Sequence, residues 1–283
     1  MVDDPFSDEL KECYHRLRQD LERIHYDTIE AFDVVQSVNQ YRLYWKPDLV
    51  KLILLAESHV YTCERDFQVF LTQKKMEGLG DDETKIDAYL HNMNHYARFV
   101  YCLGYGENDF LETPLDPLSA RNVGTWQYWK LLASCESTEK SSYDRWLKKG
   151  TRNFSQRIKN KINLLQDLKD RGIWLLDASI MGLYIPKDDN DRKDEILGIV
   201  LDICWNAYIN TVINKVNEKK KPPSIVIVGR TVEKMIGNKI QDILRLCIDQ
   251  PQSHLTKEER QEQMDELNRV AQQYAPKGSQ EKI

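Results

Sequence analysis

The sequence lacks paired cysteines, a membrane-spanning run and a signal-peptide pattern, the features that most directly assign a chain to a class of protein. Its six cysteines (13, 63, 102, 135, 204 and 247) form no Cys-x-x-Cys pair, which argues against a zinc or iron–sulfur site and favours a reducing compartment. No apolar run reaches the roughly 18–20 residues of a membrane span. The acidic start, Met1 to Asp4, lacks a signal-peptide pattern. We therefore expect a cytoplasmic monomer with no metal, no cofactor and no membrane partner.

Four short apolar runs alternate with helical patterns along the 283 residues. The runs lie at 49–56, 173–178, 224–229 and 243–248, and the helical patterns at 7–36, 83–103, 126–133, 153–171, 193–216, 231–240 and 257–274. Ser7 is expected to cap the first helix. Apolar strands separated by helices indicate βαβ units and a mainly parallel sheet. The prediction is an α/β fold, a three-layer αβα sandwich with a central four-stranded sheet. We divide the chain into an N-terminal helical extension (1–44), an α/β domain (45–275) and a flexible tail (276–283).

Three polar groups follow the ends of these apolar runs. Glu57 follows the first run, Asp177 ends the second, and His254 comes soon after the last. In open α/β sheets ligands bind outside the carboxyl ends of the strands. The sequence therefore predicts a site that brings Glu57, Asp177 and His254 together.

In the order of its strand-end motifs the chain resembles the uracil-DNA glycosylase superfamily. The turn Ala56-Glu57-Ser58-His59-Val60 stands where that family has its water-activating turn, and Leu175-Leu176-Asp177 where it has the strand that reads the base. Val228-Gly229 resembles a Trp-Gly-type turn, and Pro251-Gln252-Ser253-His254-Leu255-Thr256 the His-Pro-Ser-Pro-Leu-Ser motif with its histidine displaced. The resemblance covers about residues 45–265, and every motif departs from the family consensus.

The resemblance implies an enzyme that hydrolyses the N-glycosidic bond of a base flipped out of DNA. Glu57 would stabilise the positively charged sugar and orient a water molecule, and His254 would stabilise the departing base. Ser58, His59, Val60 and Trp126 are expected to contact the base together with Asp177. Most of these residues also have a structural interpretation. Glu57 could cap the following helix, Ser58 could be a turn serine, and Asp177 could be a buried acid bonded to a neighbouring loop. His59 could be a satisfied histidine and Trp126 a core aromatic.

Two departures from the family pattern bear on the substrate. An ionised Asp177 only accepts hydrogen bonds, which suits the exocyclic amine of a cytosine-type base better than uracil. Val60 stands where a tyrosine would block bulk at the pyrimidine 5-position, so a 5-substituent is expected to fit. Bacterial glycosylases that remove glucosylated hydroxymethylcytosine from phage DNA would match both features. The alternatives are a conventional uracil or mismatch glycosylase, a non-catalytic DNA-binding protein of the same fold, and a nucleosidase-like enzyme.

Charge is unevenly distributed despite a net value of −5. The segment Arg145–Lys161 carries seven cations and no acid. We expect Lys148, Lys149 and Arg152 to contact DNA phosphates, together with Arg121 and Ser253 elsewhere in the chain. A solvated helix face is the alternative interpretation of this segment.

Overall fold

The computed structural model describes residues 3–76, 83–119, 121–136, 145–186, 191–217 and 221–276. At its centre lies a four-stranded sheet in which every neighbouring pair is parallel, in the order β2-β1-β3-β4. The strands are β1 (Leu52–Ala56), β2 (Ile173–Asp177), β3 (Ser224–Val228) and β4 (Leu244–Ile248). Helices flank the sheet, so the predicted three-layer α/β fold is confirmed.

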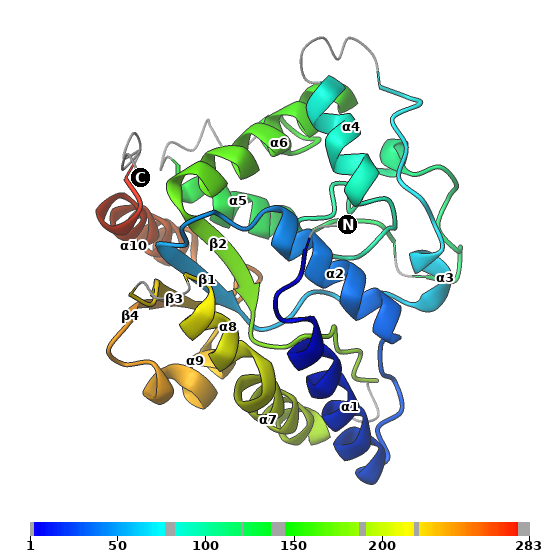
Figure 1. The fold of residues 1–283 in the computed structure, drawn as a ribbon. Coiled ribbons are helices and arrows are strands. Elements are labelled where there is room, and N and C mark those ends of the chain that lie inside the picture. Colours follow the sequence, from blue (N-terminus) through cyan, green and yellow to red (C-terminus); the bar gives the residue numbers. More distant parts are fainter. Residues whose placement is uncertain are drawn as a thin grey trace.

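The helices form the two outer layers and an N-terminal pair. Figure 1 shows α5, α6 and α10 on one side of the sheet and α7, α8 and α9 on the other. The described helices are α1 (Ser7–Arg23), α2 (Phe32–Tyr44), α3 (Glu64–Phe67), α4 (Glu83–Asn92), η2 (Asn108–Phe110), α5 (Trp126–Ser134), α6 (Phe154–Arg171), α7 (Lys193–Cys204), η5 (Trp205–Ile209), α8 (Asn210–Lys215), α9 (Arg230–Ile236), η6 (Gly237–Lys239) and α10 (Lys257–Tyr274).

The apolar character of the strands follows from their place in the sheet. All residues of β1 and β2 are buried, because helices cover both faces there. β4 is an edge strand, and most of its residues are only half-buried. The register places Ala56 opposite both Asp177 and Val228, and Val228 opposite Ile248. The residues that follow the four strands therefore emerge at one edge of the sheet.

Local signals fix where the main helices begin and end. Asn153 caps α6 by accepting a hydrogen bond from the Gln156 amide, and Gly172 ends that helix at φ 89°. A Cβ at Gly172 would lie 2.7 Å from the Leu49 carbonyl oxygen, so only glycine fits between α6 and β2. At α10 the side chains of Thr256 and Glu259 each bond the other's backbone amide, forming a capping box.

The predicted helices at 7–36 and 83–103 differ from those observed. The pattern at 7–36 is two helices, α1 and α2, because the chain turns at His25, where φ is 57°. Ser7 is not the cap: it is the first helical residue, and the N-cap position is Phe6. The pattern at 83–103 is helical only to Asn92, after which the chain turns to pair His95 with Phe70.

The N-terminal helices share the core of the sheet domain. α1 buries one stripe of side chains and packs against α7, and residues of both α1 and α2 belong to the same buried cluster as the strands. The helical stretch Lys193–Lys215 is long and apolar enough to cross a membrane, but over half of its most apolar part is buried inside the structure. Core helices have the same property. Most of the predicted flexible tail (277–283) lies outside the described residues.

Candidate functional site

A cavity of about 340 Å³ lies where the strand ends meet. Its walls come from the segments that follow β1, β2 and β4, closed by two loops between β1 and α5. The lining residues are Glu57, Ser58, His59, Val60, Arg98, Phe99, Val100, Tyr105, Gly124, Thr125, Gln127, Tyr128, Leu175, Asp177, Leu183, Gln250 and Gln252. The structure thus brings Glu57 and Asp177 together in one cavity at the carboxyl edge of the sheet.

Glu57 is the acid best placed for chemistry in this cavity. It is half-buried, and its Oε2 accepts a hydrogen bond of 3.1 Å from the side-chain amide of Gln250. Burial raises the pKa of Glu57, while Lys193, Thr231 and Gln250 oppose that rise. A carboxylate with a raised pKa is a stronger base than an exposed one.

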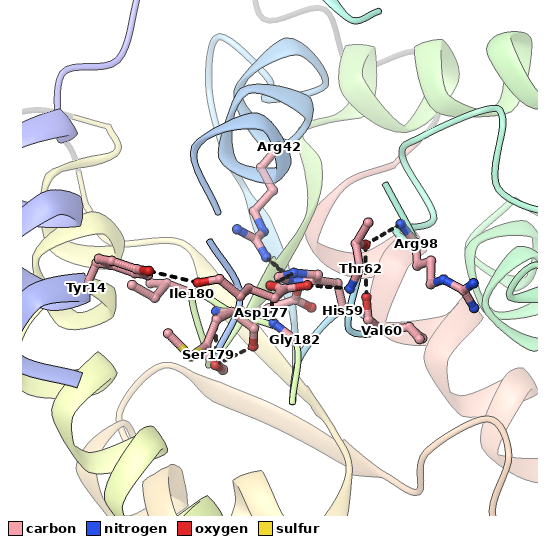
Figure 2. A network of polar contacts seen from close by, with 12 residues as sticks. Tyr14, Arg42, His59, Val60, Thr62, Arg98, Asp177, Ser179, Ile180 and Gly182 are labelled. Atoms are coloured by element: carbon pink, nitrogen blue, oxygen red, sulfur yellow. Dashed lines mark hydrogen bonds and ion pairs between the residues drawn. The ribbon is translucent and has the colours of Figure 1, made fainter. Parts of the chain in front are cut away.

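Asp177 also lines the cavity, but it belongs to a buried ion network. Its Oδ2 lies 2.6 Å from a guanidinium nitrogen of Arg42, on α2, and 3.6 Å from Nδ1 of His59. Figure 2 shows Arg42 reaching from α2 towards Asp177 and His59. Burial opposes ionisation, but Arg42 and His59 outweigh it and lower the pKa of Asp177. Asp177 is therefore an ionised, acceptor-only group.

Glu30 completes this network from the opposite side. One of its carboxylate oxygens lies 2.8 Å from Nε2 of His59 and 2.7 Å from the Gly182 amide, and the other accepts from the Thr62 amide at 2.6 Å. The Glu30 carbonyl accepts a bond from the Tyr14 hydroxyl. Figure 2 shows three of the residues that bond Glu30, namely His59, Thr62 and Gly182, close to one another. Glu30 thus fixes both segments to the N-terminal helices.

The His59 ring is enclosed by these charges. Its burial disfavours a positive charge, but Glu30 and Asp177 prevail and raise the pKa of His59. When His59 is protonated, the two negative charges of Glu30 and Asp177 are balanced by the positive charges of Arg42 and His59. Both ring nitrogens face protein groups, and the side chain is fully buried. His59 lines the cavity, but its ring nitrogens face Glu30 and Asp177, so the histidine holds the turn after β1 and its contact with a base stays a prediction.

The aromatic segment 126–129 divides among three environments. Trp129 is buried in the core. Tyr128 lines the cavity, where burial, Asp177 and Glu57 raise the pKa of its phenol. Trp126 is 42% exposed, stacks under the Lys130 ammonium and is not a lining residue, although its neighbours Thr125 and Gln127 are. Within this segment, Tyr128 rather than Trp126 is the aromatic residue that lines the cavity.

The other residues predicted to contact the base or the DNA differ in whether they line the cavity. Ser58 and Val60 both line the cavity. Val60 is 42% exposed, and its backbone pairs with that of Leu183 in an isolated parallel β-bridge. His254 is exposed and does not line the cavity. In the turn after β4 the lining residues are instead the half-buried Gln250 and the exposed Gln252. The Ser253 hydroxyl is buried without a hydrogen-bond partner among the described atoms.

The basic segment Arg145–Lys161 is not one uniform surface. Arg157 and Lys161 are buried and both contact Glu107, at 2.7 and 2.8 Å, so these two cations are neither solvated nor available to phosphates. Lys148, Lys149 and Arg152 are exposed, as is Arg121. The surface available to phosphates is therefore the first part of the segment.

Several residues of the site carried no sequence signal of their own. Arg42 and Glu30 lie outside the strand ends, and only the packing of α2 brings them to Asp177 and His59. Gln250 was detectable, since it follows the last apolar run at the same edge as Glu57. Among the described residues no cluster of His, Cys, Asp and Glu could hold a metal ion.

Comparison with known proteins adds no relative. No protein-family model matches the chain, and comparisons with the curated proteins and with the solved structures found no match either.

Proposed function

We propose that this protein is a monofunctional DNA glycosylase that hydrolyses the N-glycosidic bond of a flipped, cytosine-type base. The observation that supports this most is the pairing of a half-buried Glu57 with an ionised Asp177 in one strand-end cavity of about 340 Å³. A cavity of this size accommodates a nucleobase. The exposed cations Lys148, Lys149 and Arg152 would supply the phosphate contacts.

The chemistry assigns separate tasks to the cavity residues. When the C1′–N bond breaks, its electron pair leaves with the base and C1′ becomes positively charged. The Glu57 carboxylate stabilises that charge and accepts a proton from the water that adds to C1′. The departing base is stabilised by a hydrogen-bond donor inside the cavity. Tyr128 and Gln127 line the cavity, so we now assign this task to them rather than to the exposed His254.

The substrate class follows from Asp177 and Val60. Arg42 keeps Asp177 ionised, so it accepts a hydrogen bond from an exocyclic amine and repels the O4 of uracil. Val60, which lines the cavity and is 42% exposed, is smaller than the tyrosine of the family pattern, so we expect a 5-substituent to fit beside it. A modified cytosine, such as hydroxymethylcytosine or its glucosylated form, satisfies both conditions and is consistent with a role in defence against phage.

Glu57→Gln tests this proposal directly, because it keeps the side-chain shape and removes the charge. Duplexes and single strands each carrying uracil, cytosine, hydroxymethylcytosine or its glucosylated form are incubated with the protein, and alkali-labile abasic sites are scored. We expect wild-type excision of a cytosine-type base and a decrease of at least about a hundredfold in Glu57→Gln. DNA binding should persist.

The matched control is Glu64→Gln, an exposed acid in α3 that does not line this cavity. It should excise at the wild-type rate. Wild-type turnover by Glu57→Gln, or the absence of abasic sites on all of the DNAs, would show that the cavity does not perform glycosylase chemistry.

A further inference from the structure

A chain of side-chain amides links the turn after β4 to Glu57. Gln252 donates from Nε2 to Oε1 of Gln250 at 2.9 Å, and Gln250 in turn donates from Nε2 to Oε2 of Glu57 at 3.1 Å. All three side chains line the cavity. The chain therefore extends along the cavity wall and ends on the acid that we assign to the reaction.

The direction of this chain is fixed by chemistry. An ionised carboxylate only accepts hydrogen bonds, so the amide nitrogen of Gln250 must face Glu57 and its carbonyl oxygen must face away. Gln252 supplies a donor to that oxygen. Each amide thus favours the same orientation of the next group, and Gln250 meets Glu57 with a donor already in position.

The backbone beside Gln250 is shaped to hold it there. Gly229, which follows β3, has φ 122°, and a Cβ at this position would lie 3.0 Å from Cγ of Gln250 and 3.3 Å from its Nε2. The glycine therefore lets the glutamine side chain pass close to the end of β3 on its way to Glu57. Strand ends β1, β3 and β4 all contribute to this arrangement.

We propose that Gln250 is a positioning residue that orients the Glu57 carboxylate and stabilises its charged form. The bond engages Oε2 of Glu57, and a side-chain hydrogen bond from Thr231 also favours the charged form. Gln250 and Thr231 thus hold the carboxylate in the cavity, where the proposed function requires a water molecule or the sugar. The proposal depends on the glycosylase function only for the task of Glu57, since the way Glu57 is held is a property of the protein alone.

Other charges also act on Glu57 and must be separated from the effect of Gln250. Lys193, at the start of α7, stabilises the carboxylate, whereas Asp177 destabilises it. Tyr128 lines the same cavity and is raised in pKa by Glu57. A substitution at Gln250 that adds no charge leaves these three groups unchanged, so it isolates the contribution of the amide.

Gln250→Met is the test variant, because methionine has a similar length and packs beside Gly229 but donates no hydrogen bond. In protein labelled with ¹³C at glutamate, the Glu57 Cδ signal is assigned by its disappearance in Glu57→Gln and followed with pH. We expect the titration midpoint of Glu57 to rise by roughly half to one pH unit in Gln250→Met. The acid limb of kcat/KM for excision should move by the same amount.

Gln127→Met is the control, since Gln127 lines the same cavity and forms no described bond to Glu57. Its titration should match the wild type. A wild-type midpoint in Gln250→Met, or an equal shift in Gln127→Met, would overturn the role of Gln250. A shift in Gln250→Met alone, with no base excised by the wild type, would support that role and reject the glycosylase function.

A second measurement does not require Gln250→Met to fold. In the wild-type protein the side-chain NH₂ resonances of Gln250 should move with pH at the midpoint of Glu57. That movement should vanish in Glu57→Gln. Resonances that ignore the protonation of Glu57 would show that the two side chains do not share a hydrogen bond in solution.

Discussion

At the scale of single residues, Arg42 acts on the cavity wall through Asp177 and is not itself a lining residue. It is 1% exposed, pairs with Asp177 and lies 5.0 Å from the Phe99 ring centroid. Its backbone carbonyl accepts a bond from the Trp174 indole. Without the guanidinium, Asp177 would be a buried carboxylate whose remaining cationic neighbour is His59.

Arg42→Met is therefore expected to destabilise the protein by about 3–5 kcal/mol, the usual cost of leaving one member of a buried ion pair alone. Urea unfolding followed by tryptophan fluorescence measures the change. Adding Asp177→Asn in the same chain should recover part of the stability, because the unpaired charge is then removed. The control Arg18→Met, at an exposed arginine of α1, should unfold as the wild type does. An equal loss of stability in Arg42→Met and Arg18→Met would contradict the assignment of a buried ion pair to Arg42.

At the scale of secondary-structure elements, Glu107 joins α6 to the loop that supplies Tyr105 to the cavity. It is 2% exposed, and it receives Arg157 Nε and NH2 at 3.0 and 2.7 Å and Lys161 Nζ at 2.8 Å. Burial disfavours its charge, but Lys161 and Arg157 outweigh burial and lower the pKa of Glu107. The buried cations of α6, Arg157 and Lys161, thus stabilise the fold. The cations that precede the helix, Lys148, Lys149 and Arg152, are exposed.

Glu107→Gln should lower the free energy of unfolding by about 3–5 kcal/mol near neutral pH, since it leaves two buried cations without a carboxylate. The folded-state pKa lies below the ordinary value of 4.5, so the stabilisation is complete above that pH. It disappears as the pH falls through the lowered pKa. Urea unfolding between neutral and acidic pH should show the two proteins converging in acid. Glu112→Gln, at an exposed acid nearby, is the control, and a gap independent of pH would contradict this assignment.

At the scale of the whole molecule, the net charge of −5 hides a local concentration of cations. Lys148, Lys149 and Arg152 are exposed and lie within one short stretch of sequence before α6. Binding to phosphates releases counterions from DNA, so the affinity of such a surface falls as salt rises. The overall negative charge does not prevent this, because exposed charges are screened beyond about 10 Å at 0.1 M salt.

The combined variant Lys148→Gln, Lys149→Gln and Arg152→Gln should weaken DNA binding for all sequences. The slope of log affinity against log salt should flatten by about 0.9 for each duplex phosphate that the variant no longer neutralises. Fluorescence anisotropy at several salt concentrations measures both effects. A control with Lys11, Arg16 and Arg18 of α1 changed to glutamine removes the same charge elsewhere. An unchanged slope in the first variant, or equal flattening in both, would show that the basic segment is only solvated.

The sequence by itself determined the fold class, the strands and the edge of the sheet where polar groups gather. These properties depend on local patterns: buried strands require continuous apolar residues, and a parallel sheet places all carboxyl ends together. Glu57 and Asp177 were predicted in this way, and both line the cavity. The break near His25 and the end of α4 at Asn92 were not predicted, because the helical periodicity of the sequence continues across both positions.

Tertiary structure alone decided which partners these polar groups meet. Arg42 and Glu30 reach His59 and Asp177 across long stretches of sequence, and nothing in the local pattern marks a charged residue that another helix will bury. The turn after β4 likewise directs Gln250 inward and leaves His254 in solvent, because the path of the turn determines which side chain points into the cavity. The positions of the strands in the chain and their burial follow from sequence periodicity, whereas strand order, ion pairs and cavity-facing side chains depend on how separate elements pack.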